Sequence, residues 1–211
     1  MKEHYLIVAN GDVEFSSVQE LQMLSENRRV IALDGAANLF YKLNLLPSVA
    51  IGDFDSLSVE AEKFLRAGGV PLLSSRCQET TDLEKALGHV ARNAASAVVI
   101  HGLGGRQDHG MGNVFFLKKY AARVPDLSLL TRHCRLIYRE DTSEIFHVPS
   151  GSPCGFFGLP AATVTSEGLR YEMRDYRLKL GHSESIANES MGDNFRLHVR
   201  GQCLISLAAP Y

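Results

Sequence analysis

The 211-residue chain lacks several features that would point to a particular class of protein. It contains no tryptophan, and its four cysteines, at positions 77, 134, 154 and 203, form no Cys-x-x-Cys pair. A zinc site or a redox dithiol is therefore not indicated, and reduced thiols are the simplest interpretation. The formal net charge is only −2, so we expect no strong attraction to nucleic acid or to an anionic membrane.

Long apolar runs are also missing. The run Leu6–Ala9 near the N-terminus is too short for the core of a signal peptide, and no stretch has the length of a membrane span. Apolar residues make up 45% of the chain and charged residues 22%, as in ordinary globular proteins. We therefore expect a cytoplasmic protein with neither a membrane nor a nucleic-acid partner.

The first 132 residues alternate short apolar runs with helix-like stretches. In the clearest helix, residues 82–93, apolar residues recur at helical spacing, and Thr81 with Glu84 forms a capping-box pattern at its start. A second helix is expected over residues 109–122. This alternation predicts a doubly wound parallel sheet. The runs expected to form strands are 5–9, 29–33, 49–51, 70–73, 97–101 and 127–131.

After residue 132 the pattern changes to short strand-like runs separated by turn residues. This spacing is typical of an antiparallel sandwich or barrel. We therefore expect an α/β domain over residues 1–132 and a smaller all-β, sandwich-like domain over residues 133–211. The expected strands are 135–139, 143–149, 153–157, 162–165, 169–172, 194–199 and 202–208.

Three acidic or glycine-rich segments carry most of the functional information, and each follows a predicted strand. In an open α/β sheet the loops at the carboxyl ends of the strands meet, and ligands bind there. Carboxylate oxygens suit Mg²⁺, which in turn binds polyphosphate, and glycines and an arginine can bind phosphate directly. The pattern predicts an enzyme of phosphoryl or diphosphoryl transfer. The segments are Gly52-Asp53-Phe54-Asp55-Ser56, Thr81-Asp82-Leu83-Glu84 and Gly102–His109.

Each segment also has a purely structural interpretation. In extended backbone Asp53 and Asp55 share a face and could reach one cation, but an Asx-type turn would use both to bond the loop backbone. Thr81 suits an N-cap, and Asp34 and Asp108 could each cap a helix instead of binding a ligand. Asp82 could gain only helix-dipole stabilisation.

The glycine-rich segment after residue 101 matches neither a Walker A loop nor a dinucleotide fingerprint. Gly102, Gly104 and Gly105 still permit close approach of the backbone to an anion, and Arg106 can bind phosphate with two hydrogen bonds. Asn113, a polar residue on an apolar helix start, could line the same cleft.

Four segments in this order resemble thiamin pyrophosphokinases: Asp-Gly-Ala-Ala-Asn at 34–38, Gly-Asp-Phe-Asp-Ser at 52–56, Thr-Asp-x-Glu-Lys-Ala at 81–86, and Gly-x-Gly-Gly-Arg-x-Asp-His-x-x-x-Asn at 102–113. The resemblance implies transfer of a diphosphate group from ATP to the hydroxyl of thiamin, giving thiamin diphosphate and AMP. It implies Asp53, Asp55, Asp82 and Asp108 as catalytic residues, the first three of them binding Mg²⁺. The ATP-binding residues that it implies are Asp34, Ser56, Thr81, Gly104, Gly105, Arg106, His109 and Asn113.

The resemblance also implies a homodimer with shared active sites, in which Ser185 and Asn188 contact thiamin. The chain has Ala187 where the family usually has serine, and Gln78-Glu79 departs from the family as well. Phe195 is a candidate aromatic wall for the thiazolium cation. Asp108 or Asp82 would accept the proton of the thiamin hydroxyl. The alternatives are a related pterin diphosphokinase, a metal-dependent nucleotide hydrolase and a catalytically silent nucleotide-binding module.

Overall fold

The computed structural model describes residues 2–74 and 79–210. Its backbone divides into two compact units, Met1–Thr131 and Arg132–Tyr211. None of the helices in the described ranges is long and apolar enough to cross a membrane. The described cysteines, Cys134, Cys154 and Cys203, are free thiols, and Cys77 lies outside the described residues.

The first unit contains a parallel sheet, as the sequence predicts. Its strand order is β6-β5-β1-β2-β3-β4, and every described pair within it is parallel. The order reverses between β1 and β5, which creates the switch point at which α/β sheets bind ligands. The strands are β1 (Glu3–Val8), β2 (Arg29–Leu33), β3 (Val49–Gly52), β4 (Leu72–Ser74), β5 (Ala94–Ile100) and β6 (Leu127–Leu130).

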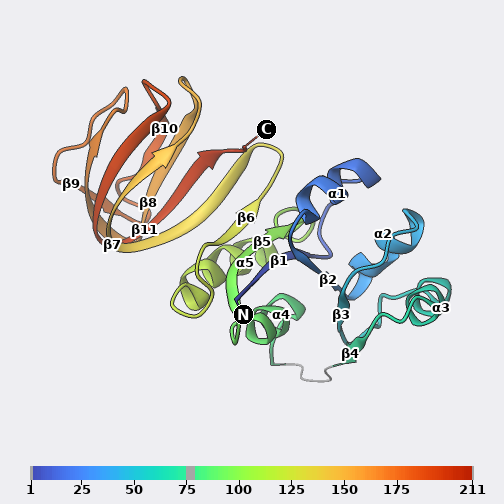
Figure 1. The fold of residues 1–211 in the computed structure, drawn as a ribbon. Helices are drawn as coiled ribbons and strands as arrows, with labels where there is room; N and C mark the ends of the chain where they lie inside the picture. The colour runs from blue at the N-terminus through green and yellow to red at the C-terminus, as the bar shows by residue number, and fades with distance from the viewer. Residues whose placement is uncertain (1, 75–78, 211) are drawn as a thin grey trace. The chain divides into compact units, whose positions relative to one another are not determined.

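Helices cover both faces of this sheet (Figure 1). Right-handed crossovers place the helices between β1 and β4 on one face and the last two on the other. Accordingly, α2 packs against α3, and α4 packs against α5. The helices are α1 (Val18–Ser25), α2 (Ala37–Lys42) after the short 3₁₀ turn η1 (Asp34–Ala36), α3 (Val59–Ala67), α4 (Asp82–Val90) and α5 (Gln107–Tyr120).

The ends of α4 and α5 differ in part from the prediction. Thr81 is the N-cap of α4, and its Oγ1 accepts the N–H of Glu84 at 3.3 Å. The prediction that the Glu84 side chain completes the capping box was wrong, because the buried Glu84 carboxylate pairs with Lys119 of α5 instead. The N-cap of α5 is Arg106, so Asp108 lies in the first turn and does not cap the helix.

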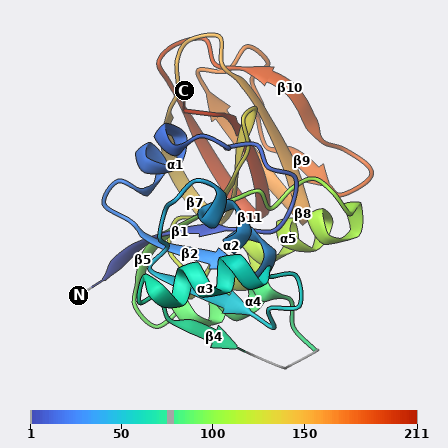
Figure 2. The same ribbon diagram turned by 90° about the vertical axis from the view of Figure 1, so that its right-hand side faces the viewer.

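The second unit is built from antiparallel strands in the order β10-β8-β11-β7, with β9 also paired to β8. Three of these strands are long and curved (Figure 2), whereas the sequence predicted several short ones. Residues 200 and 201 of β11 oppose the single residue Asp141 of β7, so a bulge lies inside the long strands where turns were expected. Gly201 has φ +88° and Asp141 has φ +44°. The strands are β7 (Cys134–His147), β8 (Pro153–Glu167), β9 (Tyr176–Lys179), β10 (Ser185–Glu189) and β11 (Asn194–Ala208).

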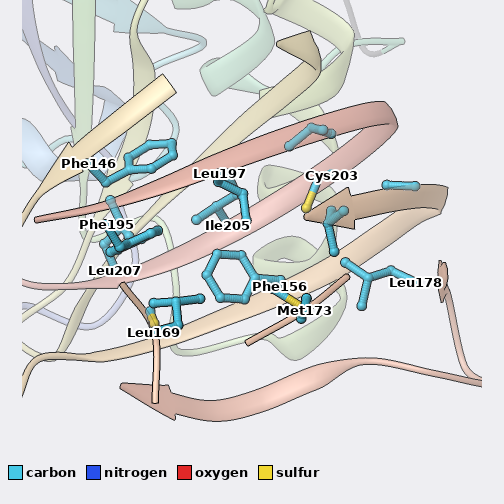
Figure 3. Packing of buried hydrophobic residues seen from close by; sticks show 14 of the residues in the cluster. Phe146, Phe156, Leu169, Met173, Leu178, Phe195, Leu197, Cys203, Ile205 and Leu207 are labelled. Atoms are coloured by element: carbon cyan, nitrogen blue, oxygen red, sulfur yellow. The ribbon is translucent and has the colours of Figure 1, made fainter. Parts of the chain in front are cut away.

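The core of the second unit centres on three phenylalanines (Figure 3). The ring of Phe195 lies 5.2 Å from that of Phe146 and 6.0 Å from that of Phe156, centroid to centroid. Phe195 is only 1% exposed. The prediction that Phe195 forms an aromatic wall for a ligand was therefore wrong, because its alternation along β11 directs it into the core.

Candidate active site

A cavity of about 510 Å³ opens in the first unit where β1, β2, β3 and β5 end. The predicted site residues that line it are Asp34, Asp53, Thr81, Asp82, Gly104, Gly105, Arg106, His109 and Asn113. The strand-end rule thus brings together segments that are far apart in the sequence.

Three carboxylates gather in this cavity. Asp34, Asp53 and Asp82 each offer an oxygen atom, and these oxygens all lie within 4.8 Å of one another. Asp34 follows β2, Asp53 follows β3, and Asp82 begins α4. Such a group of hard oxygen ligands suits a divalent cation.

Asp34 is the most buried of the three, with 5% of its surface exposed. Within the described residues, its Oδ1 atom is buried and has no hydrogen-bond partner. Burial raises the pKa of Asp34, and the charges of Asp82 and Asp55 raise it further, against the hydrogen bonds of Ser56 and Gly35. Burying a carboxylate oxygen without a hydrogen-bond partner costs folding free energy unless a ligand binds to that oxygen.

Of the two arrangements considered for the segment after β3, the extended one is wrong. Phe54 has φ +63°, in the left-handed region, so Asp53 and Asp55 do not alternate as on a strand. Asp55 is exposed and accepts the hydroxyl of Ser56 at 2.9 Å, outside the three-carboxylate cluster. A long Asx-type contact of 3.5 Å joins its N–H to Asp53 Oδ1. Asp55 as a metal ligand stays a prediction.

Asn38 joins the loops after β2 and β3. Its Nδ2 donates to the carbonyl oxygens of Gly35 at 3.0 Å and Ser56 at 2.8 Å. Its Oδ1 accepts the N–H of Ser58, the N-cap of α3, at 3.0 Å. The bonds to Ser56 and Ser58 tie the loop that carries Asp34 to the loop that carries Asp53.

Lys85 is a cavity residue to which the sequence analysis gave no role. Its side chain is only 10% exposed, and its Nζ lies 2.9 Å from Asp82 Oδ1. The i, i+3 spacing of the two residues on α4 was the available signal. Lys85 places a cation beside the carboxylates.

The loop after β5 presents hydrogen-bond donors to the cavity. Gly104 and Gly105 have φ values of +113° and +66°, which a side chain would strain. Arg106 donates to Asp108 through Nε at 3.2 Å and Nη2 at 2.6 Å. This pairing lowers the pKa of Asp108 to about 2 and raises that of Arg106. Asn113 supports the loop by donating from Nδ2 to the Gly102 carbonyl oxygen at 2.7 Å.

The loop after β1 also contributes residues to the cavity. The N–H of Gly11 donates to the carbonyl oxygen of His101 at 3.1 Å, and Asp12 Oδ2 accepts the N–H of Gly105 at 2.8 Å. Buried His101 accepts the N–H of Phe15 on Nε2 at 3.0 Å. The sequence analysis assigned no role to Asp12 or His101, both of which line the cavity.

The remaining predicted residues lie elsewhere. Ser56 and Asp108 are exposed and do not line the cavity. Ser185 and Asn188 belong to β10 of the second unit. Asn188 is buried, and its amide bonds to the Tyr171 backbone, accepting its N–H at 3.1 Å and donating to its carbonyl oxygen at 2.9 Å. Gln78 lies outside the described residues.

The sequence matches two protein families over most of its length. Residues 21–129 match "Thiamin pyrophosphokinase, catalytic domain", and residues 142–204 match "Thiamin pyrophosphokinase, vitamin B1 binding domain". The cavity-lining segments from Leu33 to Asn113 all fall within the first match.

Named relatives agree with these matches. The chain is 30% identical over 162 residues to thiamine pyrophosphokinase 1 of rice, covering 70% of this chain and 60% of that protein. It is 26% identical over 195 residues to thiamin pyrophosphokinase 1 of Caenorhabditis elegans, covering 85% and 79%. The match thus spans less than two thirds of the rice protein's length.

Solved structures show the same fold. The thiamine pyrophosphokinase of Bacillus subtilis superposes with a TM-score of 0.86 at 19% identity, covering 99% of this chain and 100% of that one. The enzyme of Candida albicans also has a TM-score of 0.86, at 15% identity, covering 99% and 89%. At these identities the likeness establishes the architecture of the α/β and β-rich units.

Proposed function

This chain belongs to the thiamin pyrophosphokinase family, and from that premise we propose that it transfers a diphosphate group from ATP to the hydroxyl of thiamin, giving thiamin diphosphate and AMP with Mg²⁺ as the metal. The first unit would bind ATP and carry the catalytic groups. The second would bind thiamin and form a homodimer with shared active sites. The observation that carries the proposal is the gathering of Asp34, Asp53 and Asp82 beside the glycine-rich loop in one cavity.

The donor set fits a magnesium ion. Three carboxylate oxygens lie within 4.8 Å of one another, and the Asp34 Oδ1 atom is buried with no partner among the described residues. Asp34, Asp53 and Asp82 would hold the ion, and Asp34 thereby joins the predicted ligands. When bound, Mg²⁺ neutralises charge on the transferred phosphates.

The protein's own groups would bind and orient the two substrates. Lys85, Arg106 and the N–H of Gly105 provide positive charge and donors for the phosphate oxygens. The thiamin hydroxyl oxygen forms a bond to the β-phosphorus of ATP, and the bond from that phosphorus to the α,β-bridging oxygen breaks, so AMP leaves with the electron pair. The hydroxyl proton passes to a carboxylate, for which Asp82 and Asp108 are the candidates.

A discontinuous assay tests the proposal. The protein is incubated with ATP, Mg²⁺ and thiamin, and the nucleotides and thiamin species are separated by chromatography. We expect AMP and thiamin diphosphate in equal amounts, and only when thiamin is present. AMP or ADP formed without thiamin would instead identify a nucleotide hydrolase, and absence of turnover would direct the assay to pterin acceptors.

The Asp53→Asn variant tests the metal assignment. The substitution preserves shape but removes one charged ligand, so we expect Mg²⁺-dependent turnover to be lost while the circular dichroism spectrum is unchanged. Wild-type turnover in this variant would remove Asp53 from the site. Light scattering tests the shared-site dimer, since a fully active monomer contradicts it.

A further inference from the structure

The loop to which we assign phosphate binding is already bonded to two carboxylates of the protein. The N–H of Gly105 donates to Asp12 Oδ2 at 2.8 Å. The guanidinium of Arg106 donates two hydrogen bonds to Asp108. The backbone N–H and the guanidinium that would donate to phosphate oxygens therefore each donate to a carboxylate of the protein in this structure.

The backbone keeps Asp12 against this loop. Gly11 approaches His101 so closely that a Cβ on Gly11 would lie 2.3 Å from the His101 carbonyl oxygen. A Cβ on Gly104 would lie 3.0 Å from Oδ2 of Asp12. The glycines at 11 and 104 thus let the β1 and β5 loops meet, and their contact places the Asp12 carboxylate on the Gly105 N–H.

We propose that Asp12 lowers the affinity of the site for ATP by competing with the phosphates for the N–H group of Gly105. This inference rests on the proposed function, because it concerns the same phosphate loop. One N–H group donates a strong bond to one oxygen at a time, and a carboxylate and a phosphate oxygen beside it also repel each other. Asp12 is exposed, so its bond can exchange for a ligand at modest cost.

The competition acts only on ligands that displace Asp12. A triphosphate also binds Arg106 and the carboxylate-bound cation, so it can bear the cost of displacing Asp12. A monophosphate such as AMP makes fewer of these contacts, so Asp12 keeps its bond to Gly105. The cost of displacement therefore falls on ATP and not on AMP, and Asp12 would narrow the difference in affinity between the two nucleotides.

A purely structural role for Asp12 predicts the opposite sign. If its carboxylate only holds the loop in the form that binds ATP, then removing it weakens nucleotide binding. Asp12→Asn retains an oxygen acceptor for the Gly105 N–H but removes the charge, whereas Asp12→Ala removes both. The two variants together separate charge competition from tethering.

Isothermal titration calorimetry with ATP and with AMP, at constant Mg²⁺ and without thiamin, tests the proposal. We expect Asp12→Asn to lower the Kd for ATP by roughly threefold to tenfold, within the range for exchange of one charge-assisted hydrogen bond. The Kd for AMP should fall by a smaller factor, so that the ratio of the two constants widens. Glu60→Gln, which removes one exposed charge from the first turn of α3, should match the wild type.

The amide resonance of Gly105 provides a second measurement. We expect it to shift in Asp12→Ala relative to wild type, and ATP should bring the two resonances to the same position. Equal or weaker ATP binding by both variants overturns the inference. Because these readouts need no thiamin, absence of thiamin diphosphate formation alongside the expected Kd values refutes the proposed reaction and leaves the role of Asp12 standing.

Discussion

Replacing Gly52 with alanine tests whether backbone packing beneath the carboxylate cluster sets its geometry. Gly52 ends β3, and a Cβ there would lie 2.8 Å from the Cβ of Asp34 and 3.1 Å from its Cα. Carbon atoms pack best at about 3.5–4.0 Å, so the end of β2 must move by about 0.7 Å or more. Both residues are buried, and we expect this overpacking to cost about 1–3 kcal/mol of stability.

The same movement displaces the Asp34 carboxylate from Asp53 and Asp82. Since a misplacement of about 1 Å can reduce a rate by two orders of magnitude, we expect kcat/KM for ATP to fall roughly tenfold or more. The Tm should fall by about 2–4 °C for each kcal/mol lost in a chain of this size. Thermal unfolding followed by circular dichroism measures the first effect, and the chromatographic assay well below the Tm measures the second.

Gly88→Ala is the matched control. It makes the same chemical change in the exposed interior of α4, where an added Cβ has no atom within 4 Å. We expect it to stabilise the protein by about 0.5–1 kcal/mol and to leave turnover unchanged. Gly52→Ala with the wild-type Tm and wild-type kcat/KM would refute the packing argument.

Three further predictions concern particular contacts. Asn38→Ala removes three hydrogen bonds, two of which join the β2 and β3 loops, so we expect a loss of about 1–3 kcal/mol and a higher Mg²⁺ concentration at half-maximal activity, measured by urea unfolding and metal titration. Phe195→Ala empties the centre of the second unit's core, and urea unfolding should show a loss of about 3–5 kcal/mol. Burial raises the pKa of the Cys154 and Cys203 thiols to about 12, so iodoacetamide at pH 8 should label neither in the native protein and both after unfolding. Because the unfolded thiols ionise near their ordinary value of 9.0, before the folded ones, stability should fall as the pH rises from about 9 to about 12.

Features that depend on neighbours in the sequence were predictable. The parallel sheet followed from alternating strand and helix patterns, and α4 begins at Asp82 after its N-cap Thr81, as expected. The cavity position of Asp34 and Asp53 followed from one topological rule, because each lies just after the end of a predicted strand. Asp82 lies at the start of a predicted helix.

Contacts between distant segments were not predictable. Glu84 fits a capping box in sequence, yet it pairs with Lys119, which is 35 residues away. Phe54 has a left-handed backbone, which turns Asp55 away from the cluster. Phenylalanine rarely adopts this conformation, so the sequence did not indicate it. In the second unit, Gly201 suggested a turn but forms a bulge, since its strand stays paired with both neighbours on either side of a register shift.

The order of residues along the chain was sufficient to predict the parallel sheet, the helices α4 and α5 and several groups that line the cavity, because periodicity and strand-end position are local properties. Whether a given group is buried, paired or free to bind a ligand depended on packing between segments. The Asp34 Oδ1 atom is buried with no partner among the described residues, and Gly52 of β3 lies against the Cβ and backbone of Asp34. Lys85 is a cavity cation because α4 packs over β2 and β3, and Asp12 reaches Gly105 because two glycines let their loops meet. Burial and electrostatic energies depend on distances in space, which the spacing of residues in the sequence does not specify.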